Sequence, residues 1–134
     1  MRTGIIGALA AASVLTLVLP VEATAQGEGR AGIEGSYRIE GMLPGQRGAY
    51  KGEVQVKRTG ETYAVGWRIG NTQSLGTGML VGDQFTVIYQ RIDGPGRPGV
   101  AVYEIKDGRI GEGVWTELGS HAVGTERWEP SDRL

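Results

Sequence analysis

The chain has no cysteine and a single histidine among its 134 residues. Without cysteine it can form no disulfide and can carry no acylated lipoprotein cysteine. His121 stands beside Ser120, but neighbouring residues on an extended chain point to opposite sides, which argues against a nucleophile and base pair. No second histidine is available for a metal site. We therefore expect His121 to be a solvated loop residue, and we expect no metal site and no catalytic residue.

The chain also has no large excess of positive or negative charge. The chain has 14 basic and 15 acidic residues and a formal net charge of -1 at pH 7. No window gathers the basic residues into a stripe that would follow a phosphate backbone. The Gly-x-x-x-x-Gly-Lys pattern of a phosphate loop does not occur either. The composition therefore predicts neither nucleic-acid binding nor a cofactor.

Only one long uncharged apolar stretch occurs, from Gly4 to Leu19, and it follows the basic Arg2. Its 16 residues fall short of the roughly 20 that a membrane-spanning helix needs, and Pro20 closes it. Ala23-Thr24-Ala25 then supplies the small residues that a signal peptidase recognises. An N-terminal membrane anchor is the alternative. We predict a signal peptide at residues 1–25, cleavage after Ala25, and a periplasmic or secreted protein with no later membrane insertion.

Glycine is abundant. It supplies 24 of the 134 residues, whereas an average protein contains about 7% glycine. The glycines have no collagen period. They separate short stretches in which apolar and polar residues alternate, which is typical of antiparallel strands joined by tight turns. We predict eight strands, at residues 36–41, 49–58, 62–69, 73–81, 84–92, 99–106, 109–116 and 122–128.

The alternation is clearest at residues 49–58, where Tyr50, Val54 and Val56 fall on one face and charged or polar side chains on the other. A strand with one dry face must bury that face against other strands. The dipeptides at the predicted ends are turn formers that tolerate positive φ, so the strands are expected to follow one another up and down. These dipeptides are Thr59-Gly60, Gly70-Asn71, Gly82-Asp83 and Asp107-Gly108.

Such a meander buries its dry face in a closed barrel or in two packed sheets, and we favour the barrel because closure removes exposed edges. The predicted fold is all-β, an antiparallel up-and-down barrel of about eight strands. The predicted organisation is a signal peptide at 1–25, a flexible leader at 26–35, one domain at 36–130 and a tail at 131–134.

The aromatic residues fall at alternating strand positions, so their default role is a filled core. An open calyx is the alternative, because inward glycines would leave space beside the rings for a small ligand. Glu126 is notable because alternation puts it on the same side as Gly124 and Trp128. The candidate ligand-binding residues of the barrel interior are Trp67, Tyr89, Tyr103, Trp115 and Glu126.

The carboxylates Glu112, Glu117 and Glu126 leave open a hydrolase that works with two carboxylates. Surface ion pairing with Arg109 and Arg127 is the favoured interpretation. One longer connection, at residues 93–99, contains two prolines and cannot lie inside a sheet. Its charged residues Asp93 and Arg97 are candidates for contact with a partner.

The segment Pro98-Gly-Val-Ala-Val-Tyr-Glu-Ile-Lys-Asp-Gly-Arg-Ile-Gly-Glu-Gly-Val-Trp115, with Gly124-Thr-Glu126 and Pro130 after it, resembles a family of small exported bacterial proteins often labelled fibronectin-binding protein. The resemblance covers most of residues 36–130. It implies an exported, all-β, non-enzymatic protein, and the family label implies adhesion to a host matrix protein. No site residue is carried over.

The leading hypothesis from the sequence is an exported, non-enzymatic binding protein that holds a protein or matrix component through hairpin loops or an open strand edge. The second is a calycin-like carrier or sensor with a small apolar ligand inside the barrel. The third is a carboxylate-based hydrolase that uses Glu126.

Overall fold

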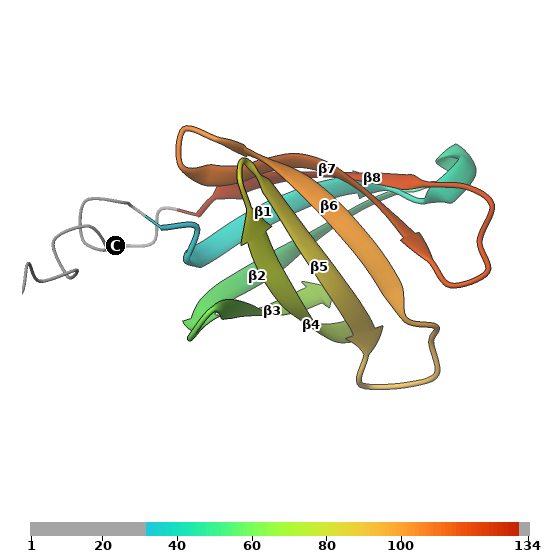
Figure 1. Cartoon of the computed structure of the whole chain (residues 1–134). Coiled ribbons are helices and arrows are strands. Elements are labelled where there is room, and N and C mark those ends of the chain that lie inside the picture. Colours follow the sequence, from blue (N-terminus) through green and yellow to red (C-terminus); the bar gives the residue numbers. More distant parts are fainter. Residues whose placement is uncertain (1–31, 132–134) are drawn as a thin grey trace, which may run out of the picture.

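The computed structural model describes residues 32–131, and these form a closed barrel of eight antiparallel strands in sequence order (Figure 1). The barrel predicted from the alternating pattern is therefore confirmed. The signal peptide predicted at residues 1–25 and the last three residues of the predicted tail lie outside the described residues. Within residues 32–131, no helix has the length and hydrophobicity needed to cross a bilayer.

Each strand pairs with its neighbours in the chain, and β1 also pairs with β8, which closes the barrel. A short 3-10 helix, η1 (Pro44–Gln46), lies in the connection between β1 and β2. The strands are β1 (Gly35–Met42), β2 (Ala49–Thr59), β3 (Thr62–Ile69), β4 (Thr72–Val81), β5 (Gln84–Arg91), β6 (Gly99–Lys106), β7 (Arg109–Glu117) and β8 (Gly124–Pro130).

The two ends of the barrel differ in their connections. At one end β2–β3, β4–β5 and β6–β7 are joined by two-residue turns, and we call this the turn end. The first of these turns consists of Gly60 and Glu61, one residue later than predicted, because Thr59 pairs with Thr62. The predicted turns at Gly82-Asp83 and Asp107-Gly108 are confirmed, with both residues of the second at positive φ.

Three longer connections gather at the opposite end, which we call the mouth: residues 43–48, 92–98 and 118–123 (Figure 1). The fourth connection there is the predicted tight turn Gly70-Asn71. Both ends of the described chain lie at the turn end, where the amide of Ser131 donates to the carbonyl of Ser36 over 2.8 Å.

The interior is packed with apolar side chains toward the turn end. Ile33 belongs to this core at 3% exposure, and the Tyr37 hydroxyl donates to its carbonyl over 2.5 Å. The barrel therefore begins earlier than the sequence indicated, since the predicted leader at 26–35 includes Ile33 and the first residue of β1. The buried apolar residues are Ile33, Tyr37, Ile39, Val54, Val56, Val65, Trp67, Phe85, Val87, Ala101, Tyr103, Ile110 and Trp128.

Several aromatic rings in the barrel lie over a glycine of the neighbouring strand. A Cβ added to any of these glycines would overlap the ring, so the position requires glycine because of close approach. The glycines thus make room for large rings inside a narrow barrel. The pairs are Gly41 with Tyr50, Gly78 with Phe85, Gly99 with Tyr89, Gly113 with Tyr103, and Gly124 with Trp115.

Candidate functional site

A buried carboxylate lies in the barrel interior. Glu126 is 5% exposed and is the buried charged residue of the described chain. Its side chain points inward because it lies between Gly124 and Trp128 on β8, where alternate residues share a face. The sequence-based placement of Glu126 on this face is therefore confirmed.

Four neutral donors bind the Glu126 carboxylate. The Trp128 indole, two residues along the same strand, donates to Oε1 over 2.6 Å. The Tyr103 hydroxyl and the Trp67 indole also donate to Oε1, over 3.0 and 3.1 Å. The Tyr50 hydroxyl donates to Oε2 over 2.5 Å. All four donors are uncharged, and together they surround the carboxylate inside the barrel.

Two glycines allow the tyrosines to reach this carboxylate. Gly41 on β1 is paired with Tyr50 on one side and with Glu126 on the other. Gly113 on β7 is likewise paired with Tyr103 on one side and with Glu126 on the other. Because neither glycine has a side chain, each phenol extends across one intervening strand. The row across the wall therefore reads Tyr103, Gly113, Glu126, Gly41, Tyr50.

A cavity of about 410 Å³ runs from the mouth to Glu126. Four of its aromatic rings contact one another in sequence: Trp67 and Tyr89 with centroids 5.6 Å apart, Tyr89 and Trp115 at 6.5 Å, and Trp115 and Tyr50 at 6.3 Å. The deep part of the cavity is thus aromatic. The lining residues are Leu43, Tyr50, Trp67, Ile69, Thr72, Ser74, Tyr89, Arg91, Pro95, Gly96, Arg97, Tyr103, Trp115, Glu117 and Glu126.

The indole N–H of Trp115 is buried and has no hydrogen-bond partner within residues 32–131. The Trp115 indole lies near the Tyr50 hydroxyl and partly offsets the rise in the pKa of Tyr50. It does not form a hydrogen bond with that hydroxyl. A buried donor without a partner is uncommon in proteins and calls for a physical explanation. Because Trp115 lines the cavity, an acceptor on a bound molecule would supply the missing partner.

Burial and the charge of Glu126 keep the surrounding phenols protonated. Burial is the main cause that raises the pKa of Tyr50 and of Tyr103, and the Glu126 carboxylate raises both further. Burial also raises the pKa of Tyr89, with added contributions from Glu117 and Glu126. The phenols of Tyr50 and Tyr103 are therefore donors to Glu126 throughout the physiological pH range.

Charges of both signs surround the mouth. Arg91 donates to Asp93 over 2.9 Å, and this hydrogen bond lowers the pKa of the Asp93 carboxyl group. Arg97 donates to the carbonyl of Leu118 over 3.4 Å, which ties two long connections together. Of the two predicted partner-binding residues, Arg97 lines the cavity, and Asp93 is an exposed residue that holds Arg91.

The five interior residues proposed from the sequence all line this cavity. Three of them, Trp67, Tyr103 and Glu126, are joined by hydrogen bonds. The interior is neither the filled core nor the fully open calyx of the two alternatives, since it is packed near the turn end and hollow near the mouth. Tyr50 and Trp128 also donate to Glu126 and were not among the predicted site residues, although alternation places both on the inner face.

Other expectations are corrected by the structure. Every strand is paired on both sides, so the barrel has no open edge for a partner strand. Glu112 is exposed on the outer face, so it forms no pair with the buried Glu126. Within residues 32–131, Arg109 and Arg127 also have partners other than the three predicted glutamates. Arg127 pairs with Glu40 and Glu129. Arg109 donates to the Tyr37 hydroxyl.

His121 lies exposed in the connection before β8, as predicted. Within the described part of the chain, no three histidine, cysteine, aspartate or glutamate side chains gather as they would around a metal ion.

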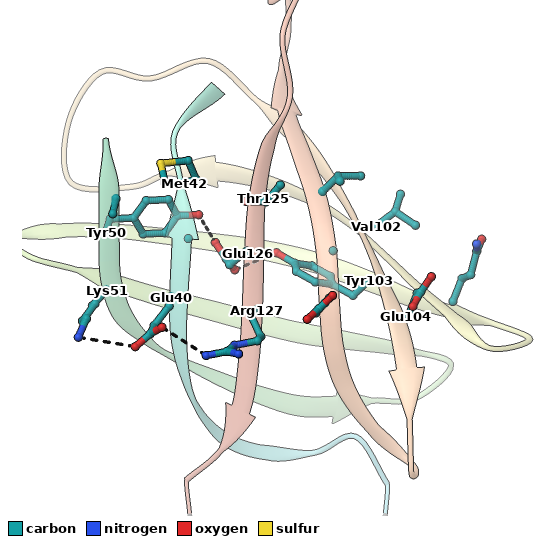
Figure 2. A pocket seen from close by; sticks show the side chains of 16 residues that line it. Glu40, Met42, Tyr50, Lys51, Val102, Tyr103, Glu104, Thr125, Glu126 and Arg127 are labelled. Carbon is teal, nitrogen blue, oxygen red and sulfur yellow. Dashed lines mark hydrogen bonds and ion pairs between the residues drawn. The ribbon is translucent and has the colours of Figure 1, made fainter. Parts of the chain in front are cut away.

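A second, open hollow of about 940 Å³ is lined mainly by outward side chains of the barrel wall, and the interior residues Tyr50, Tyr103 and Glu126 also border it (Figure 2). One row of outward side chains in it is uncharged: Val102, Val114, Thr125, Met42 and Ala49 follow one another across five strands. The next row is charged. Figure 2 shows its ion pairs, in which Glu40 lies between Lys51 at 3.6 Å and Arg127 at 3.4 Å.

Comparison with protein-family models and with curated proteins found no match to this chain.

Proposed function

We propose that this protein is an exported, calycin-like carrier or sensor that binds a small molecule inside the barrel without chemical turnover. The observation that carries the proposal is the cavity of about 410 Å³, which opens at the mouth and ends at Glu126. Ligand pockets of proteins have volumes of about 300 to 1,000 Å³, with apolar and aromatic walls and a few polar groups that orient the ligand.

Two further features support a ligand over a simple packing defect. A defect in an apolar core is expected to be lined by apolar atoms, whereas this cavity contains a carboxylate and an indole donor without a partner. The cavity also opens beside the three long connections, while the turn end is packed and tightly joined. In closed barrels the long loops at a mouth are suited to control ligand entry.

Binding is tested by the fluorescence of the tryptophans during titration with the uncharged dye N-phenyl-1-naphthylamine and with short alkyl alcohols. Trp67 and Trp115 line the cavity, so a bound molecule is expected to change their emission. The Ser74→Phe variant should fill the cavity and abolish the change. Gln73→Phe, one residue earlier and exposed on the outer face, is the matched control. A flat signal in the unmodified protein would contradict the proposal.

The exported location is a separate part of the proposal and has its own test. Expression of the full chain in a bacterial host should yield a processed protein in the periplasm or medium. N-terminal sequencing is expected to begin at Gln26. An intact N-terminus in the cytoplasm would overturn this part and leave the ligand proposal standing.

The open hollow along the barrel wall supports a second candidate, adhesion to a protein partner. Its row of uncharged side chains, from Val102 to Ala49 across the wall, is the kind of surface that interfaces bury at their centre. Immobilised fibronectin is the probe, because the sequence resembles proteins labelled as its binders. Val114→Arg should abolish retention, and Gln55→Arg on the outer face of β2 should not.

The connection at residues 92–98 can be tested with the same probe. Its replacement by Asn-Gly would remove Asp93 and Arg97 and leave a turn suited to a hairpin. If retention on fibronectin depends on this connection, the shortened protein should pass through the column while keeping its folded circular dichroism spectrum. Absence of retention for the unmodified protein would reject the adhesion candidate.

A further inference from the structure

The charge balance of the cavity is uneven. The donors to Glu126 are two phenols and two indoles, all neutral, and no cationic side chain of residues 32–131 forms an ion pair with it. The cationic residues that line the cavity are Arg91 and Arg97, near the mouth. Arg91 is paired with Asp93, and Arg97 is bonded to a carbonyl. The deep end therefore has a negative charge with dipoles around it and no counter-ion.

The two oxygens of the Glu126 carboxylate accept different numbers of hydrogen bonds. Oε1 accepts from Trp67, Tyr103 and Trp128, whereas Oε2 accepts from Tyr50 alone. A carboxylate oxygen has two lone-pair directions, so Oε2 has room for one more donor. The Tyr50 hydroxyl, which gives its proton to Oε2, also presents its own lone pairs. Both acceptors belong to residues that line the cavity.

The walls suit a positive charge as well. The faces of aromatic rings carry negative quadrupole potential, and cages of such rings recognise ammonium groups. Here Tyr50, Trp115, Tyr89 and Trp67 follow one another around the cavity with centroids 5.6 to 6.5 Å apart. A neutral apolar ligand would leave the charge of Glu126 without a counter-ion, and an anionic ligand would be repelled by it.

We propose that the ligand of this cavity is a small organic cation, an alkyl- or arylalkyl-ammonium compound whose charged nitrogen lies at Glu126 among the aromatic rings. This inference rests on the proposed function and specifies the ligand class. The ligand's nitrogen donates to Oε2 of Glu126, and its apolar part extends toward the mouth.

Three probes of equal shape and different charge test the inference: cyclohexylmethylamine, cyclohexylmethanol and cyclohexanecarboxylate. None absorbs where tryptophan does, so fluorescence and calorimetry can both be used at pH 7 on the protein purified after expression of the full chain. The amine is expected to bind at least tenfold more tightly than the alcohol, and the carboxylate more weakly than either. Glu126→Gln should remove the advantage of the amine while the alcohol still binds.

Two further variants serve as a control for the loss of a carboxylate and as a substitute if Glu126→Gln does not fold. Glu112→Gln removes a carboxylate from the outer face and should leave all three affinities unchanged. If Glu126→Gln does not fold, Tyr89→Leu serves instead, because it removes one of the four aromatic rings that surround the cavity. This change should weaken the amine several-fold more than the alcohol.

The outcomes separate the two proposals. Equal affinity for alcohol and amine, or preference for the carboxylate, would overturn the organic cation and leave a small-molecule carrier standing. An advantage of the amine that persists in Glu126→Gln would also overturn it. Binding of none of the three probes, with no response to dye either, would reject the proposed function and this inference together.

Discussion

The Tyr50 hydroxyl donates to Oε2 of Glu126 over 2.5 Å, although the two residues belong to strands that are not neighbours. The phenol crosses β1 at Gly41, where the strand has no side chain on the inner face. On the other side, Tyr103 reaches the same carboxylate across Gly113. The hydrogen bonds of Glu126 to these two phenols therefore depend on Gly41 and Gly113, because neither glycine has a side chain that would block the tyrosine ring.

Gly41→Ala is expected to displace the Tyr50 ring, because the added Cβ would overlap it. Overpacking of this kind costs about 1 to 3 kcal/mol, and the Tyr50 hydroxyl should lose its contact with Glu126. Urea unfolding measures the cost. Gly66→Ala is the control: its Cβ points outward and would come no closer than 3.6 Å to Leu75, so stability should stay equal or rise slightly.

Glu126→Leu should destabilise the barrel by at least about 3 kcal/mol, because it leaves the donors of Tyr50, Tyr103, Trp67 and Trp128 buried without an acceptor. Glu126→Gln keeps one acceptor oxygen and the shape of the side chain, so its cost is expected to be nearer about 1 kcal/mol. Chemical denaturation of both variants gives the comparison. A leucine variant as stable as the unmodified protein would show that the donors find other partners.

Val65→Asp is expected to prevent folding or to cost several kcal/mol. Val65 is 1% exposed, and the carboxylate would lie among apolar side chains without a partner. Gln55→Asp, on the outer face of the neighbouring β2, should change stability by less than about 0.5 kcal/mol. Circular dichroism and thermal unfolding distinguish the two. Similar losses at both positions would contradict the assignment of inner and outer faces.

Stability is expected to fall as the pH rises above about 10, the ordinary pKa of tyrosine in an unfolded chain. The pKa of Tyr103 is raised by burial and by Glu126, so above this pH the folded protein keeps a proton that the unfolded chain has lost. The stabilising contribution is fully present below pH 10. It decreases by about 1.4 kcal/mol for each pH unit above it. Tyr50 and Tyr89 act in the same direction, but they are partly exposed and contribute less.

Unfolding curves of the unmodified protein and of Tyr103→Phe, recorded between pH 8 and 11.5, test this dependence. The two stabilities should run parallel up to about pH 9.5, and the variant should fall less steeply beyond it. Absorbance at 295 nm reports tyrosinate. If the folded protein lost the Tyr103 proton near pH 10, the raised pKa would be refuted.

The inner and outer faces of the barrel were predictable from the sequence because a strand repeats every two residues. Val54 and Val65 are buried as expected, and the placement of Glu126 with Gly124 and Trp128 followed from the same rule. The tight turns were also predictable, since positive φ favours glycine and its polar neighbours there.

The hydrogen bonds at Glu126 could not be predicted in the same way. They depend on the pairing of β8 with β1 and on the register that aligns Gly41 with Tyr50 and Glu126, and no local pattern specifies a contact between the two ends of a meander. The burial of Ile33 was missed for a similar reason. It lies in a glycine-rich polar stretch, and its partner Tyr37 belongs to the following strand.

Ser131 and Ser36 meet at the turn end, on the side of the barrel away from the cavity opening. A fluorophore or affinity handle attached beside Ser36 or Ser131 would therefore lie away from the cavity opening. The same adjacency means that a short peptide could join the two ends of the described chain, with new termini opened in the connection at residues 92–98. Such a circular permutant would retain every strand pairing and would place its cut beside the cavity opening, where a reporter would sense the surroundings of Pro95 and Arg97.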